Sequence, residues 1–207
     1  IHRWGALGLA IALGALSAVP VGAAGFRIFE QGSKAMGMAG AFTAQADDGS
    51  AMFHNVGGLG FLDERSFMAG VTYIRALEAE MDGLDPFPGS DYSAELAKLS
   101  EFPPHFYWVE PLSDNITFGL ALNAPFGLVT EWEDPDDFLG RFISTKAELT
   151  GLDVNPNLGF RLSENFALGV GAIARFSAVA LTRRSAALNP STLQQVEVSK
   201  GLLEGDL

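Results

Sequence analysis

The 207-residue chain has no cysteine, and its 13 lysine and arginine residues face 25 aspartate and glutamate residues, giving a net charge of −12. The missing cysteine excludes disulfides and thiolate-bound metals. The acidic balance argues against nucleic-acid binding, which needs clustered lysine and arginine to neutralise phosphates. A disordered acidic tail is excluded as well, because 48% of the residues are hydrophobic and only 18% are charged.

Signatures of catalysis and metal binding are also missing. His54 and His105 lie far apart, and no cluster of His, Asp and Glu has the spacing of metal ligands. The chain has no G-x-S-x-G motif and no P-loop lysine motif. Gly169 to Ala174 fits the dinucleotide pattern G-x-G-x-x-A, but a strand-like alternation runs straight through its glycines. We therefore expect no enzyme activity, no cofactor and no metal.

The first residues have the order of a secretory signal peptide. His2-Arg3 is a short basic start, Trp4 to Leu16 is apolar or small, and small residues follow Pro20. The apolar run of about 13 residues is shorter than the roughly 20 that a transmembrane helix needs. We expect residues 1–23 to be a signal peptide that is cleaved after Ala23 on export, with a buried N-terminal helix as the alternative.

After residue 65 the main signal is an alternation of apolar residues with small or polar ones. Because successive side chains of a strand point to opposite faces, this alternation predicts strands with one apolar face. The strand candidates are 67–74, 104–110, 116–124, 152–163 and 166–181. The connections at 112–115 and 163–165 are short, whereas 75–103, 125–146 and the region from 182 onward are long. Lopsided connections favour an outer-membrane β-barrel over the alternative, a secreted β-sandwich.

Five strand candidates are too few to close a membrane barrel, whose smallest single-chain form has eight strands. An open sheet would leave unpaired edges in lipid. We therefore expect 66–207 to hold the first strands and loops of an incomplete barrel that belongs to a longer protein. Residues 24–65 are rich in Gly, Ala and Met without a sustained period, and we expect them to form a plug inside the barrel.

Several short motifs follow one another in a familiar order. They are Ala24-Gly25-Phe26, Gly32 to Gly37, Ala46-Asp47-Asp48, Asn55, Phe118-Gly119, Ala124 to Leu128, Gly140-Arg141, Asp153 to Arg161 and Leu168 to Gly171. In this order the chain resembles the outer-membrane transporters of long-chain fatty acids and aromatic hydrocarbons, the FadL/TodX type. One departure is Val56-Gly57, which replaces the Pro-Ala that follows this asparagine in the family; since proline fixes φ, its loss bears on the rigidity of that turn.

The resemblance implies an all-β fold, a fourteen-stranded antiparallel transmembrane β-barrel in a Gram-negative outer membrane, with residues 24–65 as its N-terminal hatch. It implies uptake of a hydrophobic molecule by capture on outward loops, passage to a hatch-gated pocket and lateral release through a kinked strand. Long-chain fatty acids are the expected ligand, and aromatic hydrocarbons are the alternative. A general porin and a structural β-sandwich stay open as further alternatives. Outer-membrane lipid, lipopolysaccharide and the barrel assembly machinery are the implied partners of a monomer.

Candidate site residues lie in the 125–146 connection and in the hatch. Asp134-Pro135 predicts the start of a helix, because aspartate caps helices and proline suits the first helical position. Its apolar face would join neighbouring residues in an exposed capture patch, with loop packing on the barrel rim as the alternative. The patch comprises Phe126, Leu128, Trp132, Phe138, Leu139, Phe142 and Ile143.

Two further groups of residues are expected inside the barrel. Phe26 and Phe29 are candidates for the pocket lining, with packing of the hatch core as the alternative. Asp47, Asp48, Arg161 and Arg175 are expected to form a polar network between hatch and wall, in which either arginine could bind a fatty carboxylate. The candidate gating residues are Asp47, Asp48, Asn55, Val56 and Gly57.

Overall fold

The structure is a computed structural model that describes residues 27–77, 79–84, 89, 91–188, 191 and 195–206. The expected signal peptide, residues 1–23, and Phe26 lie outside the described residues. None of the described helices is long and apolar enough to cross a membrane.

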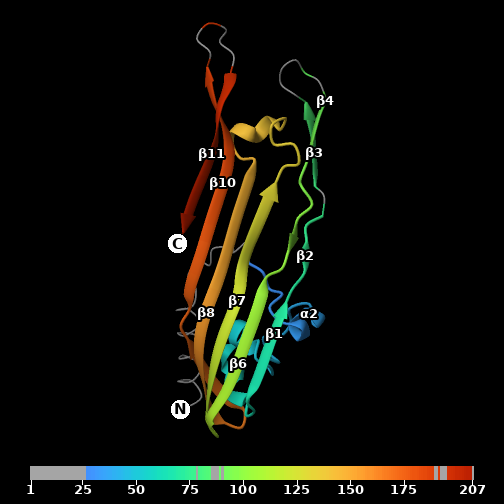
Figure 1. The fold of residues 1–207 in the computed structure, drawn as a ribbon. Coiled ribbons are helices and arrows are strands. Elements are labelled where there is room, and N and C mark those ends of the chain that lie inside the picture. Colours follow the sequence, from blue (N-terminus) through green and yellow to red (C-terminus); the bar gives the residue numbers. More distant parts are fainter. Residues whose placement is uncertain are drawn as a thin grey trace, which may run out of the picture.

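One antiparallel sheet of seven strands dominates the fold (Figure 1). Its strands are β1 (Ser66–Val71), β6 (Pro104–Ser113), β7 (Ile116–Glu131), β8 (Lys146–Ser163), β10 (Ala174–Leu188) and β11 (Gln195–Asp206), in that order, and β9 (Phe166–Gly171) pairs with β8 next to β10. Neighbours in the sheet are neighbours in the chain, as in a meander. The sheet is not closed, since β1 and β11 form its two edges.

The long connection between β1 and β6 carries two small ribbons. β2 (Ile74–Arg75) pairs with β5 (Ser100–Glu101), and β3 (Glu80–Leu84) pairs with β4 (Asp91–Glu95). A bridge between Leu96 and Trp132 joins this connection to the end of β7. The β3–β4 ribbon therefore stands at the end of the sheet that also carries the 132–145 loop (Figure 1).

The predicted alternation is confirmed in the central strands. In β7, Thr117, Gly119, Ala121 and Asn123 are buried while the residues between them stay partly exposed. On the other face of the sheet, large apolar side chains such as those of Phe166, Leu168 and Val170 are more than half exposed. An outward apolar band of this kind is what a membrane-spanning sheet presents to lipid.

The sequence prediction was wrong about the number and length of the strands. β7 continues to Glu131 and β8 begins at Lys146, so the predicted 125–146 loop shrinks to 132–145. The region from 182 onward is the end of β10 and the whole of β11 rather than a loop. The main sheet therefore has more strands than the five candidates. These parts escaped prediction because they lack the clean outward apolar phase of the lower strands.

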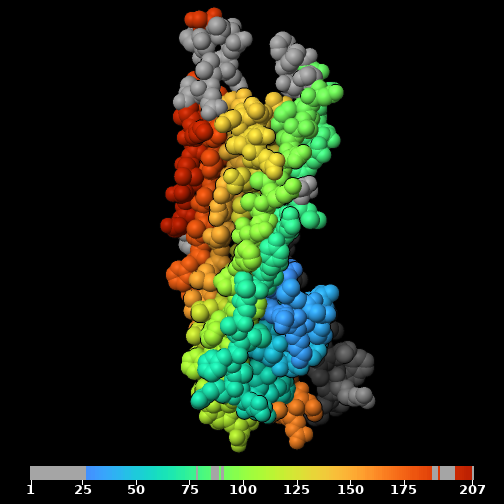
Figure 2. Space-filling model, turned by 45° about the vertical axis from the view of Figure 1, so that its right-hand side comes forward, coloured from blue at the N-terminus to red at the C-terminus, as the bar shows by residue number. Residues whose placement is uncertain are grey.

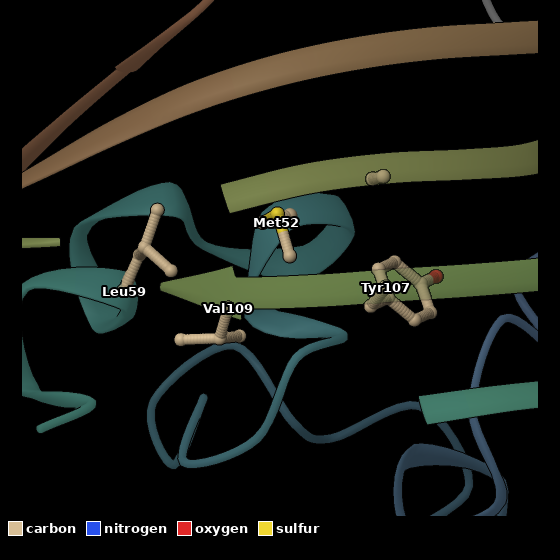
Figure 3. Packing of buried hydrophobic residues seen from close by; sticks show 5 residues of the cluster. Met52, Leu59, Tyr107 and Val109 are labelled. Atoms are coloured by element: carbon tan, nitrogen blue, oxygen red, sulfur yellow. The ribbon is translucent and has the colours of Figure 1, made fainter. Parts of the chain in front are cut away.

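Residues 27–65 hold α2 (Ser33–Gly37), α3 (Ala51–His54) and the 3-10 helix η1 (Val56–Phe61), and lie against one face of the sheet. We call this stretch the N-terminal segment, and the face that it covers the inner face. Met52 and Leu59 of the segment pack with Tyr107, Val109 and Ala121 of the main sheet in one buried cluster (Figure 3). We call the main sheet the wall. Figure 2 shows the segment gathered at one end of the molecule.

Polar side chains of the inner face fasten the segment to the wall. Tyr107 Oη donates to the Gln31 carbonyl at 2.8 Å, and Thr117 Oγ1 donates to the Leu62 carbonyl at 3.0 Å. Asn155 Nδ2 lies 3.4 Å from the Met52 carbonyl. Backbone carbonyls of an irregular segment need such partners once they are buried. The small and polar side chains of the strands thus contact the N-terminal segment rather than water.

Candidate functional site

The candidate site begins at a bulge in β7. Asn123 pairs with Asp153 and Phe126 pairs with Gly151, so β7 carries one more residue than β8 between these two pairs. A bulge leaves one residue of its strand unpaired. Pro125 has no N–H to donate to a ladder and is therefore tolerated at this place. The pairing of β7 with β6 ends at Asn123, and the upper part of β7 leaves β6 behind.

The start of the N-terminal segment occupies the edge that β6 leaves open. Arg27 bridges to Phe126, and the Ile28 N–H donates to the Pro125 carbonyl at 2.8 Å. Gln31 Nε2 donates to the Ala124 carbonyl at 2.9 Å. These short contacts hold residues 27–31 against the bulge, and no local sequence signal links the two places.

At the bulge, the apolar side chains of β7 change the face of the sheet to which they point. Before it, the inner face carries the small and polar residues that end with Asn123. After it, Phe126 lies on the inner face, because its partner Gly151 alternates in step with Asp153 and Asn155, which face the segment. Strand side chains have a period of two, so one extra residue reverses every later side chain. The apolar phase that faces outward below the bulge therefore faces inward above it.

A cavity of about 780 Å³ opens where these inward apolar residues begin. Its lining is mostly apolar and includes Ile28, Ile74, Ala76, Leu99, Phe102, Pro103, Pro104, Ala124, Phe126, Leu128, Leu149, Gly151, Leu152 and Phe176. Glu101 and Asp206 are the ionisable residues of the lining. The volume and the apolar lining are those of a small-molecule site. Of the sequence candidates, Phe126 and Leu128 reach this cavity.

An ion pair lies next to the cavity on the inner face. Arg175 Nε and Nη2 donate to the two carboxylate oxygens of Asp153 at 2.7 and 2.8 Å. The guanidinium carbon of Arg175 also lies 4.4 Å from the centre of the Phe126 ring. Asp153 is buried, whereas the Arg175 side chain is 42% exposed. A guanidinium has five N–H donors, so this pairing leaves donors for a second anion.

Comparison with known proteins identifies the fold around this cavity. The family described as "Outer membrane protein transport protein (OMPP1/FadL/TodX)" matches residues 14–204. The chain belongs to this family. Its members are outer-membrane proteins of Gram-negative bacteria, and this chain is located in the same membrane.

The similar proteins are longer than this chain. A long-chain fatty acid transport protein of Escherichia coli is 26% identical over 189 residues, which are 91% of this chain and 42% of that protein. Outer membrane protein P1 of Haemophilus influenzae is 27% identical over 202 residues, 90% of this chain and 43% of that protein. The chain thus spans less than half the length of these relatives.

One solved structure shows the fold directly. The crystal structure of a Pseudomonas aeruginosa FadL homologue matches with a TM-score of 0.69 at 20% identity, over 88% of this chain and 46% of that one. The described sheet is therefore an unclosed part of a FadL-type β-barrel, as the alternation and the resemblance predicted.

For this FadL/TodX-family chain, the prediction of a helix that starts at Asp134-Pro135 is wrong. Residues 134–143 form a turn and the 3-10 helix η2 (Leu139–Phe142). Phe138 is only 8% exposed, and its ring stacks on Trp132 with centroids 3.9 Å apart. It folds over Gly140, where a Cβ would strike the ring, and this glycine is the local signal that prediction missed.

The exposed apolar residues of that loop are fewer than expected. Ile143 is 84% exposed and Leu139 is 38% exposed, while the Phe142 ring lies under the Arg141 guanidinium at 4.6 Å. Buried Arg184 of β10 holds the loop in place through Asp136, at 2.6 Å. The predicted patch is thus divided between the cavity, a stacked aromatic pair, the Phe142 ring under Arg141 and two exposed side chains.

The predicted polar network between hatch and wall does not form from its four members. Asp47 pairs with Lys34 of the segment at 2.6 Å, and Asp48 accepts from the Ser50 hydroxyl at 2.6 Å. The hydrogen bond from Lys34 lowers the pKa of the Asp47 carboxyl. Arg175 pairs with the wall, as described above. Arg161 reaches across, with its guanidinium 5.3 Å from the Phe61 ring.

The remaining hatch candidates shape the start of η1. Asn55 Oδ1 accepts from the Gly57 N–H at 3.1 Å, and its Nδ2 donates to the Thr43 carbonyl at 2.9 Å. Val56 stands at the first position of η1, where proline is favoured, and the helix forms without it. Phe29 is 54% exposed, and its ring lies 5.2 Å from the Arg27 guanidinium.

Two glycines on the small-residue face of the predicted strands, which the sequence analysis did not assign to the site, contact η1. A Cβ at Gly169 would lie 2.7 Å from the Gly57 nitrogen, and one at Gly159 would lie 2.7 Å from the Leu59 carbonyl carbon. Real Cβ atoms do not approach backbone so closely, so the backbones of segment and wall touch at these positions. The signal was present in the sequence as glycines on the small-residue face of the predicted strands.

Among the described residues, no group of three or more His, Asp or Glu side chains could hold a metal ion.

Proposed function

We propose that the chain is part of an outer-membrane channel that takes up long-chain fatty acids, without a catalytic step. The observation that carries the proposal is the apolar cavity of about 780 Å³ at the β7 bulge, bordered by Ile28 of the N-terminal segment. The name of the Escherichia coli relative, a long-chain fatty acid transport protein, supports the same ligand class.

The physical chemistry of the ligand favours an apolar route. Each methylene group gains about 0.8 kcal/mol on leaving water, so an alkyl chain of sixteen carbons stands to lose about 13 kcal/mol in an aqueous channel. The cavity avoids this cost. Above Asn123 β7 no longer pairs with β6, and Phe102 and Pro103 line the cavity beside this gap. The arrangement supports lateral release into the membrane, with the N-terminal segment as a gating hatch.

The fatty acid carboxylate needs a partner of its own. Arg175 is the basic group beside Phe126, and its pairing with Asp153 leaves further N–H donors. We therefore assign Arg175 the carboxylate. The exposed apolar band on the other face supports outer-membrane lipid as the surroundings. Lipopolysaccharide and the barrel assembly machinery complete the proposed partners of a monomeric barrel.

A second candidate ligand is an uncharged aromatic hydrocarbon. Both ionisable residues of the cavity lining, Glu101 and Asp206, are acidic, and an acidic lining disfavours an anion. A neutral ring would need no partner at Arg175.

The test is ligand uptake by cells that lack their own fatty acid transporter and express the complete gene. Uptake of labelled oleate above the empty-vector level is expected, and equal uptake would contradict the proposal. Phe126→Asp puts a charge into the cavity and should abolish oleate uptake. Leu77→Asp, at a side chain that is 83% exposed and outside the cavity lining, is the control.

Arg175 separates the two candidate ligands. The double variant Asp153→Asn with Arg175→Gln removes both charges of the pair and leaves no buried charge unpaired. If the ligand is a fatty acid, this variant loses oleate uptake but keeps toluene uptake. Toluene uptake without oleate uptake in the unmodified protein would favour the aromatic hydrocarbon. Heat-modifiable migration in gels confirms that each variant has folded as a barrel.

A further inference from the structure

Two kinds of glycine occur on the inner face of the sheet. At Gly159 and Gly169 a Cβ would strike the backbone of η1, so packing requires glycine there. Gly151 of β8 is different. A Cβ at Gly151 would have its nearest neighbours at 3.5 Å (Phe126 Cβ) and 3.7 Å (Ser177 Oγ), which is ordinary van der Waals contact. Packing therefore leaves room for a side chain at position 151.

The backbone does not require glycine at position 151 either. Gly151 pairs with Phe126 of β7, in the first pair above the bulge, and with Ser177 of β10 on the other side; the extra residue of the bulge belongs to β7 and not to β8. It is not among the described residues with positive φ. Glycine inside a strand weakens the strand, because it has no side chain to pack and loses the most conformational freedom on folding. Folding alone would favour a larger residue here.

The position of Gly151 in the cavity wall offers a functional reason for glycine, which folding does not. Gly151 is buried and lines the apolar cavity together with Phe126, Leu149 and Ser177. Its missing side chain leaves open space in the cavity wall, where the alkyl part of a ligand can lie. We propose that Gly151 determines the length of the ligand that the cavity accepts, an inference that rests on the proposed uptake of fatty acids.

The expected effect of filling this space follows from the length of the displaced chain. A leucine side chain adds four carbon atoms to the wall of the cavity. Each methylene that can no longer enter weakens binding about fourfold, so two displaced methylenes weaken binding about fifteenfold. A short ligand that does not reach position 151 keeps its affinity. Selectivity should therefore change with ligand length, whereas a general disturbance would weaken all ligands together.

The test measures dissociation constants of saturated fatty acids from eight to eighteen carbons on purified protein from the complete gene. Gly151→Leu and Gly151→Val are compared with the unmodified protein. Gly201→Leu is the matched control, because Gly201 is also a strand glycine whose Cβ would meet its neighbours at 3.7 to 3.9 Å, and it does not line the cavity. Heat-modifiable migration at rising temperature reports the stability of each barrel.

We expect Gly151→Leu to bind the eighteen-carbon acid about fifteenfold more weakly, with the eight-carbon acid changed less than about twofold. Gly151→Val should show the same trend to a smaller degree while its barrel is at least as heat-stable, because valine favours strands. Valine carries the test if the leucine variant does not assemble. Equal weakening of all lengths, or unchanged binding of the longest acid, would overturn the inference. If the unmodified protein binds no fatty acid, the proposed function itself fails.

Discussion

Gly169→Ala is the substitution that most directly tests how the N-terminal segment is held in place. Gly169 lies in β9, and a methyl group there would lie 2.7 Å from the Gly57 nitrogen and closer still to the Val56 carbonyl group. These are backbone atoms of η1, which cannot rotate away as the end of a flexible side chain could. The segment must therefore move, or β9 must bend away from it.

The size of the effect comes from two opposing contributions. Overpacking a well-packed contact costs about 1–3 kcal/mol. Replacing glycine by alanine stabilises a strand position without a clash by about 0.4–1 kcal/mol, through the unfolded state. The difference, about 1–2 kcal/mol against docking, raises the fraction of molecules with an undocked segment about 5- to 30-fold. Gly205→Ala in β11 isolates the second contribution, since a Cβ there would meet nothing within 4 Å.

The assay is ion conductance in planar lipid bilayers, with the protein from the complete gene. An undocked segment should open brief water-filled conductances in Gly169→Ala, about 5- to 30-fold more often than in the unmodified protein. Gly205→Ala should conduct as rarely as the unmodified protein and form an equally stable barrel. A Gly169→Ala barrel that folds normally but conducts no more often than the Gly205→Ala control would refute the idea that η1 is seated on this glycine.

Three further outcomes are expected. Burial lowers the pKa of His54, so docking of the segment is at full strength above about pH 6.5 and weakens as pH falls towards the folded-state pKa; proteolysis of residues 27–65 should be faster at pH 5.5 than at 7.5, and His54→Gln should remove the difference. Phe138→Ser breaks the stack with Trp132 and should cost about 3 kcal/mol and expose the 132–145 loop to protease, whereas Ile143→Ser should slow oleate capture with the loop intact. Lys34→Ala removes an exposed ion pair and should change stability by about 1 kcal/mol or less, measured by thermal unfolding.

The sequence predicted the central strands because their two faces meet different surroundings. Along 116–123 one side chain in two faces outward and is apolar, while the next faces the segment and is small or polar. The prediction stopped at residue 124 because Pro125 has no N–H to donate to a ladder and resembles the end of a strand. Phe126 and Leu128 continue the same apolar alternation, but after the proline they were assigned to a loop.

The candidate site was predicted in its residues more than in its arrangement. Phe126 and Leu128 were expected on an exposed loop, but they lie in a strand and line the cavity. Phe138 was expected on an apolar helix face, but its ring turns inward over Gly140. The contact of Ile28 with Pro125 joins residues almost a hundred positions apart. Local patterns do not report such pairings, because they depend on where β6 leaves the edge of β7.

Because of the bulge, the apolar side chains of β7 face lipid below it and the cavity above it. Below it, an apolar phase must face lipid, because a polar side chain there would lose its hydrogen bonds to water. Above it, the same phase without a bulge would still point outward, and the inner wall would carry small and polar residues that hold no hydrophobic ligand. One extra residue between Asn123 and Phe126 turns the apolar side chains inward at the level where the cavity begins. The pairing of β7 with β6 also ends at Asn123, and the strand edge left free above it is the one on which the start of the N-terminal segment docks. Cavity, free edge and docking site therefore meet at residues 123–126 of β7, so a change in the register of β7 there should alter all three together.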